Sequence, residues 1–298
     1  MRRSAILSGL VLAMAMAAPP ALAHVATPQA GWRGPEPWAL VPALLGAGLY
    51  ALGHARLRAR AGRGRPELAR RGTLFAAGWL TLAAAALSPL HDLGARSFTA
   101  HMAEHELLML AAAPLLVMSR PLPAMLWALP AVWRGALGGL GRSRPVQGLW
   151  RTFSDPLVAT VIQAAVLWIW HLPSMFDRAL KAEAWHAAQH ICFLVAALFF
   201  WSAMLGPRRS PWMAAACLFV TSMATGALGA FMALSQSPWY GPYASLGLAA
   251  FNLTPAQDQQ LAGALMWVPG GLLHALVAVA LLAPQLRSAP KPAERAHA

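Results

Sequence analysis

Two pairs of histidines stand four residues apart within long apolar stretches of the sequence. His101 and His105 form the first pair, and His186 and His190 form the second. Residues four apart share one face of a helix, where their Cβ atoms lie about 5–6 Å apart. Each pair can therefore offer two imidazoles to one ion, and neutral imidazole suits copper, zinc, iron and nickel. Two such pairs in one chain predict a metal site.

Further candidate ligands are expected at the same depth as these pairs. His171 follows an apolar run that ends at Trp170, so it should close a helix there. Met102 and Met266 carry thioethers, which are soft ligands that suit Cu(I). We therefore predict a site for copper, as Cu(I), with Met102 and Met266 as additional candidates beside the main set: His101, His105, His171, His186 and His190.

Four other polar side chains deserve separate interpretations. His24 could chelate copper through its α-amine and imidazole if it begins the mature chain, or it could be a solvated terminus. Asp258 could orient a metal-bound histidine, as such imidazoles usually require, or it could cap a helix. His91 is placed near the site by position alone. His274 should lie about 20 Å along its helix, as a buried structural residue or a second, deeper metal site.

The composition indicates a membrane protein. The 298 residues are 58% hydrophobic and 11% charged, whereas a soluble domain usually carries about 25% charged residues. The net charge of +13 raises the possibility of a nucleic-acid partner. However, the basic residues fall between apolar runs and form no basic face, so we expect a lipid bilayer as the surroundings and no nucleic acid.

Seven apolar segments are long enough to cross about 30 Å of hydrocarbon. Only helices satisfy every backbone group in lipid at this length, so the predicted fold class is all-α, a polytopic membrane helix bundle. The segments form one domain over residues 24–283, and residues 284–298 are expected to be a disordered basic tail. The seven predicted spans are 38–55, 73–90, 101–118, 156–172, 186–205, 212–234 and 261–283.

The orientation follows from the ends and the connections. Residues 1–23 have the pattern of a cleavable signal peptide, with basic, apolar and small-residue regions in order. Alternate connections then carry 17 and 4 Lys and Arg residues, and the basic set marks the cytoplasmic side. We therefore expect the N-terminus outside, the C-terminus inside, and the histidines on the periplasmic side of a bacterial inner membrane. The connection 119–155 contains an apolar stretch that Pro121, Pro123 and Pro130 interrupt, and it is expected to be interfacial.

Taken in order, four motifs resemble the membrane-spanning CtaG-type cytochrome c oxidase assembly factors, over about residues 73–283. The resemblance implies a non-enzymatic metallochaperone of the respiratory chain that aids copper insertion into an oxidase. Its partners would be cytochrome c oxidase subunits and a periplasmic copper donor. The motifs are His101-Met102-Ala103-Glu104-His105, Trp170-His171-Leu172-Pro173, His186-Ala187-Ala188-Gln189-His190, and Asp258-Gln259-Gln260 with Met266-Trp267 and Pro269-Gly270-Gly271.

Two other classes of protein remain open on the residues alone. His101 to His105 also matches H-x-x-E-H, an inverted zinc-protease motif, with Glu104 as general base and Glu183 as a third ligand. Paired histidines on facing helices could instead hold haem as axial ligands. A plain transporter is disfavoured, because apart from His274 the predicted spans lack ionisable groups at mid-membrane depth.

Overall fold

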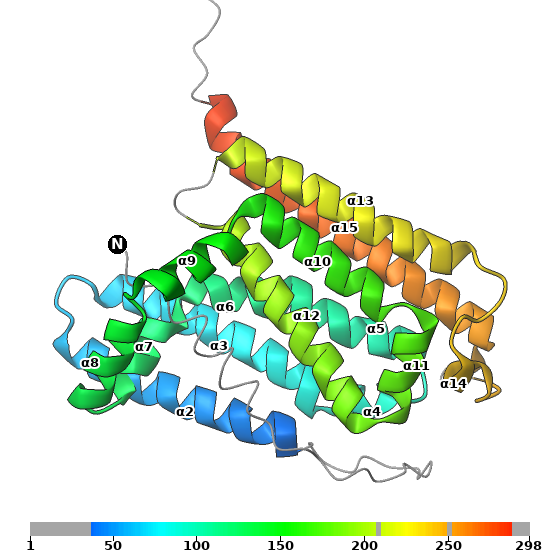
Figure 1. Ribbon diagram of the computed structural model, residues 1–298, viewed down its shortest axis with the longest axis horizontal. Coiled ribbons are helices and arrows are strands. Elements are labelled where there is room, and N and C mark those ends of the chain that lie inside the picture. Colours follow the sequence, from blue (N-terminus) through cyan, green and yellow to red (C-terminus); the bar gives the residue numbers. More distant parts are fainter. Residues whose placement is uncertain (1–36, 207–209, 249–251, 288–298) are drawn as a thin grey trace, which may run out of the picture.

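The computed structural model describes residues 37–206, 210–248 and 252–287, and no strand occurs among them (Figure 1). The signal segment 1–23, His24 and residues 288–298 lie outside the described residues. The π-helix is labelled η1. The elements are α2 (Pro37–Arg60), α3 (Arg65–Leu87), α4 (Pro89–Gly94), α5 (Phe98–Glu106), η1 (Leu107–Ala112), α6 (Ala113–Ser119), α7 (Pro121–Ala128), α8 (Ala131–Leu140), α9 (Arg144–Phe153), α10 (Pro156–Trp170), α11 (Pro173–Lys181), α12 (Glu183–Met204), α13 (Pro211–Leu234), α14 (Gly241–Ala244) and α15 (Pro255–Arg287).

The long helices make this a multi-pass membrane protein. Five described spans are long and apolar enough to cross a bilayer: α2, the combined α5–η1–α6, α12, α13 and α15. The pair α9 and α10, bent by 66°, supplies a sixth if it counts as one span. The predicted second span corresponds to α3, which misses this criterion because Arg70 and Arg71 fall within its windows of 18 residues. The all-helical expectation is therefore confirmed for the described residues, whereas seven spans are not.

The histidine pairs and the most basic segments lie at opposite ends of the bundle. In Figure 1, α4, α11 and α14 lie at one end with the start of α5 and α12, which is where the histidine pairs fall. The opposite end holds α7, α8 and α9 and the connection between α2 and α3. Residues 54–72, around that connection, carry 7 Lys and Arg residues and the segment 119–155 carries 5, of the 23 in the chain. These basic segments therefore lie at the end of the bundle opposite the histidine pairs.

The proline-rich connection 119–155 forms three short helices rather than a span. α7 packs against α2, where the Arg56 guanidinium donates to the carbonyls of Trp127 and Ala128 at 3.1 and 2.7 Å. The guanidinium of Arg134 lies 4.3 Å from the centroid of the Trp127 ring. The two hydrogen bonds from Arg56 satisfy carbonyls at the end of α7, where no following helical turn supplies N–H donors.

A π-helical turn interrupts the span that carries the first histidine pair. In η1 the Ala113 N–H donates to the carbonyl of Leu108, five residues back. In the same pattern the carbonyl of Met109 would need the N–H of residue 114, but that residue is Pro114 and has none. The indole Nε1–H of Trp201 donates to this carbonyl instead, at 2.8 Å. A side chain of α12 thus completes the backbone hydrogen bonding of η1.

The helices α13 and α15 pack together at glycines. A Cβ at Gly229 would lie 2.7 Å from the carbonyl oxygen of Gly263, and one at Gly263 would overlap the carbonyl oxygen of Gly229. Small residues of this kind let membrane helices approach until their backbones touch. α15 also continues through Pro269 to Arg287, so the helix extends past the predicted boundary at 283.

Replacement of Gly263 by alanine should separate α13 from α15 and lower the thermal unfolding temperature of the purified protein. The matched control is Gly48→Ala on α2, where a Cβ meets nothing within 4 Å. There the gain in helix propensity of up to about 1 kcal/mol should leave stability equal or higher. Equal unfolding temperatures for the two variants would contradict close packing at Gly263.

Candidate metal centre

The start of α5 is fixed by a carboxylate from the other end of the chain. Asp258 on α15 is buried, and its oxygens accept hydrogen bonds from the Ser97 hydroxyl and from the backbone N–H groups of Phe98 and Thr99, at 3.0, 2.6 and 3.1 Å. These donors are among those that a helix start leaves unpaired. Asp258 therefore caps α5 rather than its own helix. Of the two interpretations given above, helix capping is correct, although the capped helix is α5, and the hydrogen bonds of Asp258 go to no histidine ring.

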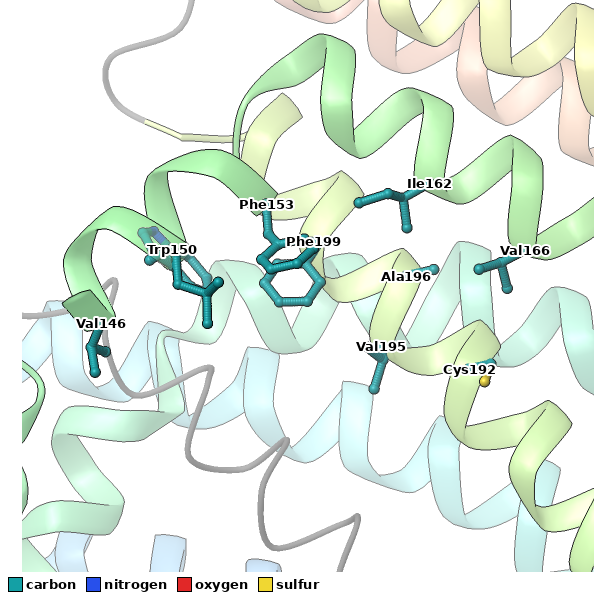
Figure 2. A pocket seen from close by; sticks show the side chains of 10 residues that line it. Val146, Trp150, Phe153, Ile162, Val166, Cys192, Val195, Ala196 and Phe199 are labelled. Carbon is teal, nitrogen blue, oxygen red and sulfur yellow. The ribbon is translucent and has the colours of Figure 1, made fainter.

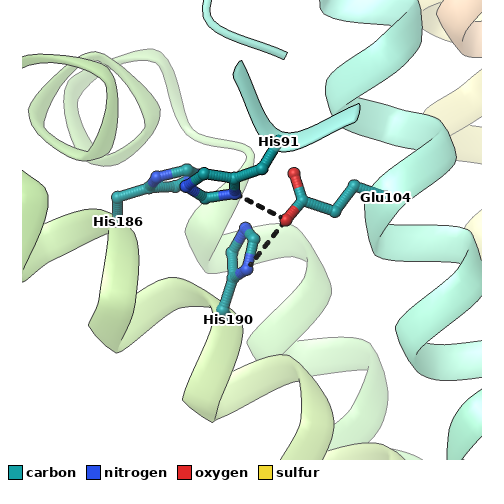
Figure 3. A group of neighbouring side chains, drawn as sticks. All are labelled: His91, Glu104, His186 and His190. Carbon is teal, nitrogen blue, oxygen red and sulfur yellow. Dashed lines mark hydrogen bonds and ion pairs between the residues drawn. The ribbon is translucent and has the colours of Figure 1, made fainter. Parts of the chain in front are cut away.

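The structure brings two groups of candidate ligands together. His101, His105 and His190 form one group, in which the ligand atoms lie within 4.8 Å of one another. His91, Glu104, His186 and His190 form the second, with the same limit, and are shown in Figure 3. His190 belongs to both groups, so the six residues form one continuous set. We call this set the histidine cluster.

The imidazoles of the histidine cluster pack directly against one another. Ring centroids lie 4.4 Å apart within each predicted pair, His101–His105 and His186–His190. Between the two helices, His105 lies 5.0 Å from His190 and His101 lies 5.1 Å from His186. Four residues predicted from spacing alone therefore share one site, with α5 and α12 supplying a pair each.

Several ring nitrogens in the cluster have neither a hydrogen-bond partner nor an ion-pair partner among the described residues. They are His101 Nε2, His186 Nε2, His190 Nε2 and both ring nitrogens of His105. Buried polar atoms are nearly always paired in proteins, and a bound ion is a recognised reason for the exceptions. The unpaired atoms face one another across a few ångströms. This is the donor set that a metal accepting nitrogen ligands requires.

Glu104 and His91 complete the cluster. The Glu104 side chain is fully buried, and its Oε1 lies 2.8 Å from His91 Nδ1 and 3.4 Å from His190 Nδ1 (Figure 3). The His91 ring stacks on that of His186, with centroids 4.9 Å apart. Sequence reasoning had placed His91 by position only and had considered Glu104 only as a protease base. A histidine on the short helix α4 has no spacing partner that could have revealed it.

Tyr243 holds one of the cluster histidines and was missed from the sequence. Its hydroxyl donates to the Gly94 carbonyl at 2.5 Å and lies 3.1 Å from His101 Nδ1. Burial, reinforced by the carboxylates of Asp258 and Glu104, raises the pKa of the Tyr243 hydroxyl well above its usual value. Because the single hydroxyl proton goes to Gly94, the oxygen can accept from His101 Nδ1–H. The Nε2 lone pair of His101 then faces the cluster.

His171 and Met102 lie beside the cluster but outside both groups. His171 Nδ1 bonds to the Leu167 carbonyl at 2.7 Å, and its Nε2 lies 3.5 Å from Met102 Sδ. The ring of Phe193 contacts both His105 and His171, with centroids at 4.6 and 5.9 Å. His171 therefore lies beside the cluster, with a phenylalanine ring packed against it and its Nε2 facing a sulfur, and its part in one shared metal site stays a prediction.

The two remaining candidates lie in the core. Met266 is buried on α15. His274 is also buried, donates from Nδ1 to the Gly270 carbonyl at 2.7 Å, and stacks on Trp201 with centroids 5.8 Å apart. A buried, hydrogen-bonded histidine is what its depth in the helix predicted.

A hydrophobic cavity elsewhere in the bundle has none of this chemistry. It measures about 310 Å³ and lies between α9, α10 and α12, lined by aliphatic and aromatic side chains and by Cys192 (Figure 2). No histidine or carboxylate lines it. The histidine cluster and this cavity are therefore separate features.

The geometry is unfavourable to the two catalytic and redox alternatives. Glu183, the suggested third zinc ligand, is exposed at the start of α12 and belongs to neither group. Glu104 bonds to a histidine instead of standing beside an open coordination position, which a zinc protease needs. Ring centroids only 4.4–5.1 Å apart leave no room for a haem between the imidazoles.

Comparison with known proteins gives one family and several relatives. The family described as cytochrome c oxidase caa3 assembly factor (Caa3_CtaG) matches residues 48–288. Uncharacterized proteins of Mycobacterium bovis and Mycobacterium tuberculosis are each 31% identical over 294 residues, covering 93% of this chain and 42% of theirs. An uncharacterized protein of Mycobacterium leprae is 29% identical over 260 residues, covering 80% of this chain and 37% of its own.

This chain thus spans less than half the length of these relatives. No solved structure matches. The family match includes α3 to α15, and with them the whole histidine cluster. On this match the chain belongs to the cytochrome c oxidase caa3 assembly factor family.

Proposed function

We propose that this protein binds Cu(I) at the histidine cluster and passes it to a copper-containing cytochrome c oxidase during assembly. The observation that carries the proposal is the set of unpaired, mutually facing imidazole nitrogens on α5 and α12. Copper is the cargo in this scheme and not a resident cofactor. The family supports the destination, since its members are described as assembly factors for this oxidase.

The cluster has more donors than one ion needs. The cluster contains five histidines and one carboxylate, and His190 belongs to both groups of ligands. A copper ion can therefore exchange one imidazole for another while it remains bound. Such exchange favours a carrier, because an acceptor protein can replace the ligands one at a time.

The proposed side of the membrane is the periplasmic side of a bacterial inner membrane. The cluster lies at the end of the bundle opposite the basic connections (Figure 1). Since basic connections mark the cytoplasmic side, the cluster would face outward, where a periplasmic donor could deliver copper. Direct transfer to oxidase subunits is the last step of the proposal.

The first prediction from this proposal concerns metal content. The protein purified in detergent should bind about one copper or more per chain after Cu(I) loading, since the cluster offers imidazoles from two helices. Replacement of His101, His105, His186 and His190 by alanine should remove the copper that the cluster holds and so lower the copper content below that of the parent, measured by mass spectrometry of bound metals. The control is His54→Ala, near the end of α2 that lies away from the cluster, and this variant should bind copper as the parent does. Zinc in place of copper, or copper unchanged in the quadruple variant, would contradict the proposal.

The second prediction concerns the residue that orients His101. Tyr243→Phe removes the oxygen that lies 3.1 Å from His101 Nδ1. Partners that orient a ligand histidine typically contribute about 10- to 100-fold in metal affinity, so Cu(I) binding should weaken by that factor in competition with a chelator. Tyr50→Phe is the matched control, because Tyr50 is also buried but stacks on Phe75 away from the cluster. Unchanged affinity in Tyr243→Phe would show that the hydroxyl does not act on the site.

The third prediction concerns the oxidase. Cells that carry His101→Ala with His105→Ala should assemble the oxidase polypeptides but with less copper and less activity, because the carrier has lost one of its pairs. The measurement is copper per oxidase after purification, with His54→Ala cells as the control. Full copper and full activity in the double variant would exclude the carrier role even if the purified protein binds copper.

A further inference from the structure

A thioether and an imidazole meet beside the histidine cluster with nothing of the protein between them. Met102 Sδ lies 3.5 Å from His171 Nε2, and both side chains are buried, with 0% and 2% of their surfaces exposed. Met102 comes from α5, and His171 follows the last turn of α10. Two separate helices therefore bring these atoms together.

The hydrogen bonding of His171 decides which atoms face each other. Its Nδ1 lies 2.7 Å from the Leu167 carbonyl oxygen, which can only accept, so Nδ1 carries a proton. In the neutral ring Nε2 then holds a lone pair. The sulfur of Met102 has no hydrogen to donate. Two lone pairs thus point at each other in a buried place, where neither can be satisfied by the other.

A proton on Nε2 is a poor solution to this conflict. It would make His171 an imidazolium whose nearest partner is a thioether, a weak acceptor. Burying a charge without an ionic partner is strongly unfavourable. A cation that accepts both lone pairs removes the conflict and brings its own charge to ligands that suit it.

We propose that Met102 and His171 form a second copper site, selective for Cu(I), separate from the histidine cluster. The inference rests on the proposed function in taking copper to be the cargo. Typical metal bonds are about 2.0 Å to imidazole nitrogen and about 2.3 Å to sulfur, so a separation of 3.5 Å corresponds to an N–metal–S angle of about 110°. Thioether sulfur is a soft ligand, which favours Cu(I) over Zn²⁺ at this site.

The surroundings hold the two ligands in place. Tyr240 donates from its hydroxyl to the carbonyl of His171 at 3.0 Å, which fixes the backbone there. The ring of Phe176 packs against His171 and also against His101, with centroids at 5.7 and 5.0 Å. Because Met102 directly follows His101, one turn of α5 contributes to both sites. Copper could therefore move from the histidine cluster to a mixed nitrogen–sulfur site over a short distance.

The test is X-ray absorption at the copper edge on full-length protein in detergent, loaded with Cu(I) under ascorbate. The parent should show sulfur as well as imidazole scattering, and Met102→Leu should lose the sulfur and about one copper per chain. Met204→Leu is the matched control, because Met204 is equally buried on α12, near the other end of the bundle. Its sulfur scattering and copper content should equal those of the parent, and the two variants should unfold at similar temperatures.

The same measurement on the quadruple histidine variant separates this site from the cluster. Copper that remains there with a sulfur ligand supports the second site and shows that it does not depend on the first. Nitrogen-only copper in the parent would overturn the second site and leave the cluster standing. Sulfur scattering that survives in Met102→Leu would also overturn it, since another methionine would then be the ligand. A parent that binds no copper at all would contradict both sites.

Discussion

The contact on which the metal centre depends is the capping of α5 by the carboxylate of Asp258. Two backbone N–H groups and the Ser97 hydroxyl at the start of α5 point to oxygens from α15, some 160 residues further along the chain. Every ligand on α5 lies within two turns of that cap. The depth of Asp258 is in turn set by the close approach of α15 to α13 at Gly263 and Gly229. A carboxylate and two glycines thus fix where the imidazoles stand.

The sequence predicted those parts of the site that depend on local periodicity. The pairs at His101 and His186 were found because residues four apart must share a helix face, whatever surrounds the helix. The positions of the long helices were predicted from the length of the apolar runs. α3 is also a helix, but Arg70 and Arg71 keep it below the criterion for a span. Ends of helices were also accessible, because proline and a capping serine or aspartate mark several of them, as at Asp155.

The remaining contacts depend on how distant segments pack, and no local pattern carries that information. Tyr243 reaches His101 across 142 residues, and His91 comes from a helix of only six residues. His171 shows the same limit in reverse. Its depth was predicted well, but the direction of its ring was set by its bond to Leu167 and by the packing of Phe193. Depth can be counted along a helix, whereas rotation about the axis is decided by neighbours.

The π-helical turn in η1 has a consequence for how the two halves of this span relate. One extra residue in a turn advances every later side chain by about 100° around the axis. The first half, α5, aims its histidines at α12, while the second half, α6, packs Leu115 and Leu116 against Gly78 of α3. The side chains of the two halves therefore point in different directions around the axis, and each half can pack against its own neighbouring helices. Deleting one residue from Leu107–Ala112 would bring them into phase and turn the histidines away from α12, although the hydropathy of the span would hardly change.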